Sequence, residues 1–263
     1  MPQALPYPVR ALLDLLFPAR CQSCGRFGPE LLCADCRSAL RPISPPFCLR
    51  CGLPFDPLAK GGELCAGCRG RSRWPYRWAR SAAYYQGPLR EAIINFKFHR
   101  RRVLAGPLAE LMLAAVERWQ AAWLPESEPD HWEVLCPVPL HPWREQARGF
   151  NQCELLCRRL GEAWGLPVEK LLVRSRETQP QVDLPGEARR GNVRGAFVPA
   201  SEGRVQGRSI LVVDDLWTTG STLVECARAL RGAEAVYLFS LARPPREQAS
   251  PGAAVDRARA GSV

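Results

Sequence analysis

From about residue 77 onward, short apolar runs alternate with longer stretches in which apolar residues recur every three or four positions. The short runs predict β-strands, and the longer stretches predict amphipathic helices. Strands that alternate with helices form parallel sheets covered by those helices, so this part of the chain is expected to adopt an α/β fold. Strands are predicted at Ala79 to Gln86, Val134 to Val138, Ile210 to Val213 and Ala235 to Leu241, and helices at Leu89 to Lys97, Leu104 to Trp119, 150–164 and 221–231.

The run from Ile210 to Val213 differs from the other predicted strands because two acidic residues, Asp214 and Asp215, follow it directly. Four consecutive aliphatic residues suit a strand that is buried on both faces, and this strand is predicted to stop at the acid pair. The carboxyl end of such a strand is the edge at which open α/β sheets bind ligands. Because carboxylates only accept hydrogen bonds, we expect the pair to bind a sugar diol.

A short loop rich in hydroxyl groups follows the acid pair and leads into a predicted helix. Backbone amides at a helix start, with a glycine that lets them come close, favour a phosphate monoester. Together with the diol site, the loop predicts that the chain binds a ribose 5-phosphate group. The alternative is an ordinary strand followed by a helix cap, although a cap does not require two acids. The loop residues are Thr218, Thr219, Gly220, Ser221 and Thr222.

A second anion site is predicted where the strand at Val134 to Val138 ends. Arginines and a helix start follow it, and a pyrophosphate group requires arginines or backbone amides of this kind. A plain surface turn beside a basic helix is the alternative. The residues of this predicted site are Pro137, Val138, Pro139, Arg144 and Arg148.

A long polar stretch without periodicity separates the two predicted anion loops. A connection of this kind is usually either a functional lid or a disordered segment. The candidate lid residues are Arg174, Arg176, Thr178, Gln179, Gln181, Arg189 and Asn192.

The amino-terminal part of the chain contains eight cysteines in four Cys-x-x-Cys pairs. This spacing fits metal-binding knuckles, and residues 18–75 are too poor in large apolar residues to fold without such support. The simplest arrangement is two tetrahedral Cys₄ zinc sites; a cross-braced pairing, iron–sulfur ligation and unrelated structural cysteines are the alternatives. An amphipathic helix is predicted to precede them at residues 8–17. The two predicted sites contain Cys21, Cys24, Cys33 and Cys36, and Cys48, Cys51, Cys65 and Cys68.

Composition is that of a soluble globular protein, with 263 residues of which 46% are hydrophobic and 24% charged. No apolar run reaches the roughly 18 residues that a membrane span needs. Asp14 interrupts the apolar start, so no secretion signal is expected, and the cysteine spacing fits a reducing compartment. A cytoplasmic location is therefore predicted. The net charge is +10, and residues 1–78 hold 11 Lys and Arg against 5 Asp and Glu, which places +6 of it near the cysteines.

The acid pair and its loop, ILVVDDLWTTGSTL, resemble the phosphoribosyl pyrophosphate (PRPP) motif of type I phosphoribosyltransferases. The resemblance implies that Asp214 and Asp215 hold the ribose 2- and 3-hydroxyls and that the loop holds the 5-phosphate. It also implies that the arginine loop holds the pyrophosphate of Mg²⁺-bound PRPP, and that the polar stretch is the flexible loop that closes over it. Trp217 is large for a variable position of the motif, where it could narrow the ribose pocket.

The order of the motifs after paired zinc ribbons is similar to the competence protein F (ComF) family over about residues 10–243. Together with the change in composition near Arg77, this resemblance implies a helix and double zinc-ribbon domain at 1–76 and a type I phosphoribosyltransferase-like domain at 77–243. The Ala-, Gly- and Arg-rich composition of the end of the chain predicts a disordered tail at 244–263. The family resemblance implies a protein that binds PRPP and handles incoming single-stranded DNA in natural transformation, with DNA-uptake or helicase proteins as further partners. The alternative is an active phosphoribosyltransferase without a role in DNA uptake. Its catalytic residues would be Asp214, Asp215 and Arg148.

The basic run of Lys97, His99 and Arg100 to Arg102 has two interpretations. It is either a solvated helix end, which is the commoner case, or a surface that contacts the phosphates of a single nucleic-acid strand. In the second interpretation, Trp74, Tyr76 and Trp78 of the basic zinc region would stack on the bases. The remaining cysteines are predicted to be core residues: Cys136, Cys153, Cys157 and Cys226.

Overall fold

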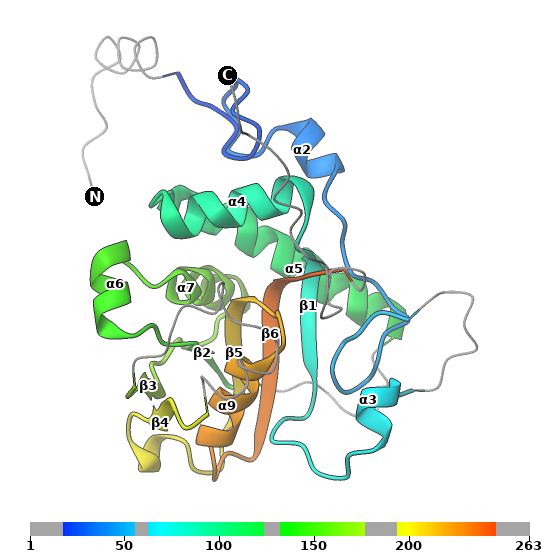
Figure 1. The fold of residues 1–263 in the computed structure, drawn as a ribbon, viewed down its shortest axis with the longest axis vertical. Helices are drawn as coiled ribbons and strands as arrows, with labels where there is room; N and C mark the ends of the chain where they lie inside the picture. The colour runs from blue at the N-terminus through cyan, green and yellow to red at the C-terminus, as the bar shows by residue number, and fades with distance from the viewer. Residues whose placement is uncertain (1–17, 56–62, 124–131, 177–193, 246–263) are drawn as a thin grey trace, which may run out of the picture.

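The computed structural model describes residues 18–55, 63–123, 132–176 and 194–245. Its centre is a four-stranded sheet in the order β1-β6-β5-β2, in which every neighbouring pair is parallel (Figure 1). This sheet confirms the predicted α/β fold. The strands are β1 (Ala79–Tyr84), β2 (Val134–Pro137), β5 (Ser209–Leu216) and β6 (Ala235–Arg243).

Helices cover both faces of the sheet (Figure 1). One face shares its apolar core with α4 (Gly87–Phe98), α5 (Ala105–Trp123) and α7 (Gln152–Trp164), and the other with α9 (Ser221–Ala229). In β5, Leu211 and Val213 belong to the first core, whereas Ile210 and Val212 belong to the second. Because successive side chains of a strand point to opposite faces, this continuous aliphatic run is buried on both, as predicted.

Several short elements lie outside the sequence prediction. Strands β3 (Leu172–Arg174) and β4 (Phe197–Pro199) form a small antiparallel sheet, and β4 packs beside α9. The polar stretch that was expected to start at Arg174 therefore begins inside a strand. The other short elements are α6 (Pro142–Arg148), η1 (Arg102–Leu104) and η3 (Glu202–Arg204).

The prediction that β5 stops at the acid pair is wrong. The strand continues to Leu216, with Asp214 opposite Ser240 and Leu216 opposite Ala242. The extension occurs because β6 runs on to Arg243 and keeps offering hydrogen-bond partners; even the amide of Trp217 donates to the carbonyl of Ala242 at 2.8 Å. The acid pair is consequently held by regular strand backbone.

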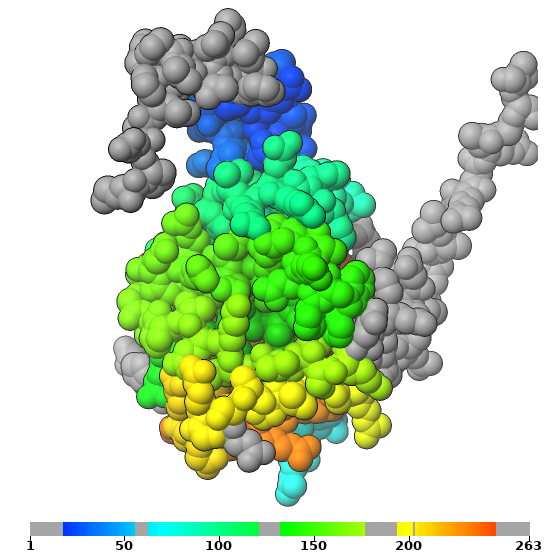
Figure 2. Space-filling view, turned by 90° about the vertical axis from the view of Figure 1, so that its left-hand side faces the viewer, coloured from blue at the N-terminus to red at the C-terminus, as the bar shows by residue number. Residues whose placement is uncertain are grey.

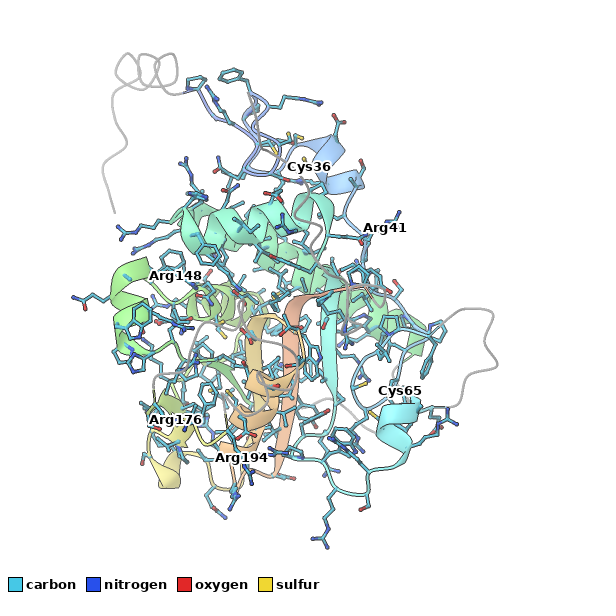
Figure 3. The ribbon with its side chains drawn as sticks, viewed as in Figure 1. Cys36, Arg41, Cys65, Arg148, Arg176 and Arg194 are labelled. Atoms are coloured by element: carbon cyan, nitrogen blue, oxygen red, sulfur yellow. The ribbon has the colours of Figure 1, made fainter. Side chains whose placement is uncertain are left out.

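The two cysteine modules are structural repeats of each other. In each, the amide of the first cysteine donates at 2.8 Å to a carbonyl five residues later, and a glycine amide donates back to that cysteine at 2.9 Å. Short helices, α2 (Ala34–Ser38) and α3 (Ala66–Arg69), begin directly after Cys33 and Cys65. Figure 3 shows Cys36 and Cys65 in separate parts of the molecule. The helix predicted at residues 8–17 and all but the first two residues of the tail predicted at 244–263 lie outside the described residues.

Each module rests on a different part of the sheet structure. The first lies on α4, where the Ser23 hydroxyl donates to the Pro88 carbonyl at 2.9 Å (Figure 2, blue on teal). The second lies against β1, where the amide of Ala79 donates to the Arg50 carbonyl at 2.8 Å and Arg80 donates to the Leu49 carbonyl at 2.9 Å.

Gly52 allows the second module to approach β1 closely. Its φ is 64°, and a Cβ at this position would lie 2.4 Å from the carbonyl oxygen of Ala79. We predict that Gly52→Ala lowers the free energy of unfolding by about 1–2 kcal/mol for the left-handed backbone and by about 1–3 kcal/mol more for the overlap.

Gly25→Ala is the matched control for this prediction. Gly25 holds the equivalent place in the first module with φ 75°, but a Cβ there meets nothing within 4 Å. For Gly25→Ala we therefore expect only the loss of stability that comes from the left-handed backbone. Denaturant unfolding of the zinc-loaded variants measures both losses, and equal losses would show that the close approach is unimportant.

Candidate functional site

The acid pair is buried at the carboxyl end of β5. Asp214 is 7% exposed and Asp215 is 3% exposed. Because side chains alternate along a strand, Asp215 lies on the face of α4 and α7, and Asp214 lies on the face of α9. Burying two adjacent carboxylates is costly unless nearby groups compensate their charge.

Lys97 supplies that compensation. Its Nζ lies 2.8 Å from Oδ2 of Asp215, and its side chain is 17% exposed. Burial alone would lower the pKa of Lys97, but the carboxylates of Asp215 and Asp214 raise it above its usual value. The interpretation of Lys97 as part of a solvated basic run is therefore wrong. The signal in the sequence was its position four residues after Ile93, on the buried face of α4.

Among the described residues, Asp214 has no ion-pair partner comparable to Lys97. Its Oδ1 accepts hydrogen bonds from the amide of Asp215 at 2.8 Å and from the thiol of Cys153 at 3.4 Å. Burial, followed by the neighbouring charge of Asp215, raises the pKa of Asp214 to about 7. The prediction that Cys153 is a buried core residue is confirmed, since it is 0% exposed. Asp214 can therefore change its charge near neutral pH.

The loop after β5 presents unpaired amides next to the acid pair. Within the described part of the chain, the amides of Thr218, Thr219 and Gly220 donate to no backbone carbonyl. The hydroxyls of Thr219 and Ser221 lie 2.6 Å apart, and α9 begins at Ser221. Amides at a helix start combined with hydroxyl donors are suited to an anion.

Trp217 packs against the inner side of this loop. Its side chain is buried, and a Cβ at Gly220 would lie 2.3 Å from the indole ring. Gly220 has φ 77°, so a side chain there is excluded both by the backbone conformation and by the ring. The guanidinium of Arg243 lies 5.6 Å from the centroid of the same indole. The tryptophan thus packs against the loop, in addition to any effect on a ribose pocket.

The second predicted anion loop lies beside the first. The amide of Val138 donates to the Val213 carbonyl at 3.0 Å, directly before the acid pair. Asn151, which caps α7, donates through its side chain to the Val138 carbonyl at 3.0 Å. Arg144 and Arg148 are four residues apart in α6 and therefore share a face of it. Both predicted anion loops thus meet at one edge of the sheet.

The rest of the basic run supports α6. Arg100 donates to the carbonyl of Ala147 at 2.7 Å, and Arg102 donates to the carbonyl of Gly149. Carbonyls at a helix end carry partial negative charge, so cations are favourable there. The guanidinium of Arg148 lies 5.5 Å from the centroid of the Phe98 ring. These arginines position the predicted pyrophosphate loop.

The first two candidate lid residues lie at the end of β3. Arg174 is buried, and burial, followed by the charge of Arg144, lowers its pKa, whereas Asp214 acts in the opposite direction. Arg176 donates to the carbonyl of Arg194 at 2.8 Å, which joins the two arms of the connection (Figure 3). The structure places Arg174 within the electrostatic reach of both predicted loops. The other candidates, Thr178, Gln179, Gln181, Arg189 and Asn192, lie outside the described residues.

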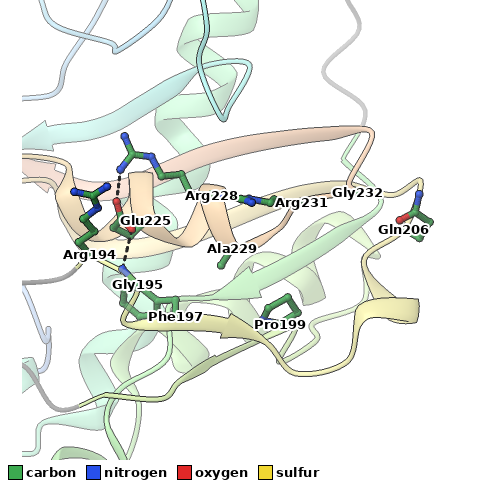
Figure 4. A pocket seen from close by; sticks show the side chains of 10 residues that line it. All are labelled: Arg194, Gly195, Phe197, Pro199, Gln206, Glu225, Arg228, Ala229, Arg231 and Gly232. Carbon is green, nitrogen blue, oxygen red and sulfur yellow. Dashed lines mark hydrogen bonds and ion pairs between the residues drawn. The ribbon is translucent and has the colours of Figure 1, made fainter.

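A separate cavity of about 1140 Å³ lies between α9 and β4 (Figure 4). Arg194, Arg228 and Arg231 line it. Glu225 accepts from the amide of Gly195 at 3.1 Å and pairs with Arg228, which fastens this arm to α9. None of the lining residues belongs to the predicted ribose-phosphate site.

Eight cysteines form two clusters that match the predicted consecutive pairing. Cys21, Cys24, Cys33 and Cys36 form one cluster, and Cys48, Cys51, Cys65 and Cys68 form the other, with all sulfur atoms of a cluster within 4.8 Å of one another.

The dimensions of both clusters fit zinc. The Cys24 and Cys33 sulfurs are 3.8 Å apart, and those of Cys51 and Cys65 are 3.7 Å apart. A tetrahedral site with zinc–sulfur bonds of about 2.3 Å requires sulfur separations of about 3.8 Å. A hydrogen bond from Cys51 lowers the pKa of Cys48 to about 4, which favours the thiolate that binds metal.

The aromatic residues of the zinc region do not form a free stacking surface. Tyr76 is buried, Trp74 is half-buried against it at a ring separation of 5.4 Å, and Trp78 packs on Tyr237 at 5.2 Å. The prediction that these three rings stack on nucleic-acid bases is therefore not supported by their exposure.

No helix among the described residues combines the length and the apolar character that a bilayer crossing requires.

Known proteins similar to this chain cover most of its length. The "Double zinc ribbon domain" family matches residues 12–74. The DNA utilization protein YhgH of Escherichia coli (strain K12) is 34% identical and covers 87% of this chain and 99% of its own. Competence protein F of Haemophilus influenzae is 31% identical, with 81% of this chain and 90% of its own covered. The solved glutamine PRPP amidotransferase of B. subtilis covers 54% of this chain and 26% of its own, with 24% identity and a TM-score of 0.32.

The matches to the two sequence relatives extend over more than four fifths of this chain and therefore reach into both its cysteine-rich part and its sheet part. The paired Cys₄ clusters and the parallel sheet agree with that extent. The chain therefore belongs to the ComF family of competence protein F.

Proposed function

We propose that this protein binds Mg²⁺-PRPP at the carboxyl edge of its sheet. The observation that carries the proposal is the buried acid pair followed by a turn of unpaired amides and a helix start. Carboxylates accept hydrogen bonds from vicinal hydroxyls, and amides donate to a phosphate. A ribose 5-phosphate satisfies both groups at once.

Each part of the site has a distinct task in this proposal. Asp214 and Asp215 accept the ribose 2- and 3-hydroxyls, and the loop Thr218–Thr222 holds the 5-phosphate. Arg144 and Arg148, with the backbone of Pro137 to Pro139, hold the pyrophosphate. Oxygen ligands from the acid pair suit Mg²⁺, and the ion would neutralise part of the pyrophosphate charge. Lys97 pairs with Asp215 and orients its carboxylate.

Catalytic transfer is the second candidate function. Displacement of pyrophosphate from ribose C1 relies on positioning and charge neutralisation, so few acid–base groups are needed. Asp214, Asp215 and Arg148 would be the catalytic residues. Release of pyrophosphate from PRPP in the presence of a nitrogenous base, a nucleotide or single-stranded DNA tests this activity, and its absence with all acceptors would leave binding as the function.

The relatives' names suggest the biological setting. One relative is named a DNA utilization protein and another a competence protein. We extend this to the present chain as a role in natural transformation, in which a cytoplasmic protein handles incoming single-stranded DNA together with DNA-uptake or helicase proteins. The net charge of +10 is consistent with a polyanionic partner.

Calorimetry with Mg²⁺-PRPP tests the primary proposal. We expect wild type to bind and Asp214→Asn to weaken binding about tenfold or more, because a hydrogen bond to a charged group contributes about 1.5–3 kcal/mol. Glu91→Gln is the control, since Glu91 lies on α4 outside the site and pairs with Arg90. Unaltered affinity of a folded Asp214→Asn variant would exclude Asp214 from the ribose site.

The raised pKa of Asp214 predicts two opposite pH dependences. Affinity for PRPP should increase as pH rises through about 7, because the ionised carboxylate is the better acceptor. Stability of the ligand-free protein should decrease as pH rises from about 4 to about 7, because the folded state then binds more protons than the unfolded state.

Comparison of wild type with Asp214→Asn isolates both pH dependences. Asp214→Asn should remove the Asp214 contribution from affinity measured by calorimetry and from stability measured by denaturant unfolding at each pH. Identical pH profiles for wild type and this variant would assign the titration to other groups.

A further inference from the structure

Two large aromatic side chains are exposed close to the predicted pyrophosphate loop. Phe98, the last residue of α4, is 62% exposed, and Trp143, in the first turn of α6, is 44% exposed. Exposed aromatic rings cost solvation free energy, and neighbouring ones often mark a binding surface. Figure 2 shows the teal region of α4 next to the green region that contains α6 on one side of the molecule.

Arginines accompany both rings. The guanidinium of Arg148 lies 5.5 Å from the centroid of Phe98, and that of Arg144 lies 5.3 Å from the centroid of Trp143. Arg100 joins the two helices through its 2.7 Å bond to the Ala147 carbonyl. Both rings therefore lie at α6, Trp143 as part of the helix and Phe98 through its contact with Arg148.

The charge of this surface is strongly positive. Arg100, Arg101 and Arg102 are all exposed and follow Phe98 after His99, whereas α6 carries a single acid, Glu145. The carbonyl contacts of Arg100 and Arg102 are with neutral groups, so they leave the positive charge uncompensated. We call Phe98, Arg100, Arg101, Trp143 and Arg144 the aromatic–arginine surface.

We infer that the aromatic–arginine surface binds a single strand of nucleic acid, an inference that rests on the proposed DNA-handling role. Unpaired bases expose flat faces that stack on Phe98 and Trp143, and the arginines contact the phosphates between them. In a duplex the base faces are stacked on one another and cannot contact the rings. An acidic peptide could pair with the arginines, but it has no bases to stack on Phe98 and Trp143. The strand would pass beside the predicted pyrophosphate loop, because Arg144 belongs to both.

Fluorescence anisotropy with a labelled oligothymidylate of about 20 nucleotides tests the inference. Phe98→Leu and Trp143→Leu keep an apolar side chain but remove the flat ring. Each should weaken binding about fivefold or more, which corresponds to the loss of one stacked base. Arg101→Gln should weaken binding and reduce the slope of log affinity against log salt by about one.

Two variants serve as controls. Val103→Ala alters an exposed apolar side chain, 58% exposed, that is close in sequence but has no ring, so binding should not change. Phe98→Tyr keeps the ring and should bind like wild type. Thermal unfolding of every variant identifies any that fail to fold.

The outcomes separate this inference from the PRPP proposal. Leucine variants that are folded and bind the strand as tightly as wild type, or a wild type that binds no single strand, would overturn the inference. Tight binding of duplex that is insensitive to Phe98 and Trp143 would do the same. If calorimetry detects no PRPP while strand binding depends on both rings, the PRPP proposal fails and the surface stands. If the protein binds PRPP but no single strand, the inference about the surface fails and the PRPP proposal stands.

Discussion

The burial of two adjacent carboxylates at the end of β5 constrains the surrounding structure. Ionised side chains placed next to each other in a poorly solvated position repel each other and lose hydration. One charge is compensated by Lys97, at 2.8 Å from Asp215, and the other is reduced because the pKa of Asp214 rises to about 7. The acid pair therefore requires α4 at a defined distance from β5. Buried carboxylates with a shifted pKa at the edge of a sheet are typical of a binding site.

The segment from Asn95 to Arg102 meets that requirement and connects the site to its surroundings. Asn95 donates through its side chain to the carbonyl of Gln22 in the first cysteine module, and Lys97 pairs with Asp215. Arg100 and Arg102 close the end of α6 through the carbonyls of Ala147 and Gly149. A stretch of eight positions thus contacts the first cysteine module, the acid pair and the predicted pyrophosphate loop. Its basic character serves internal contacts as well as the solvent-facing surface.

Local patterns made most of this fold predictable from the sequence. The parallel sheet follows from the alternation of strand and helix patterns, and the consecutive cysteine pairing was the simplest arrangement of four Cys-x-x-Cys pairs. Acidic and hydroxyl residues around β5 could be recognised because they are contiguous. The ion pair between Lys97 and Asp215 could not be recognised from the sequence, because it joins segments that are far apart in the chain. The continuation of β5 to Leu216 likewise depends on the length of β6, and the three-residue strands β3 and β4 are too short for a period to appear.

The two cysteine modules are placed so that each supports one half of the proposed site. The first module contacts α4 through Asn95, two residues before the lysine that holds Asp215. In the second module, the Cys51 carbonyl accepts from Arg243 at 3.1 Å. Arg243 lies over the ring of Trp217, which packs on Gly220 of the predicted phosphate loop.

Among the described residues, the buried members of the second module's own apolar cluster are all cysteines, Cys48, Cys65 and Cys68. Because these cysteines are the predicted metal ligands, we expect metal binding to make this support rigid. The geometry of the acid pair and of the amide turn is therefore linked to the zinc clusters through two independent chains of contacts. Each chain contains one polar or basic side chain that bridges a module carbonyl and the sheet domain, Asn95 in the first and Arg243 in the second. The metal-binding ribbon modules and the sheet edge proposed to bind a sugar phosphate are in this way parts of one mechanical unit.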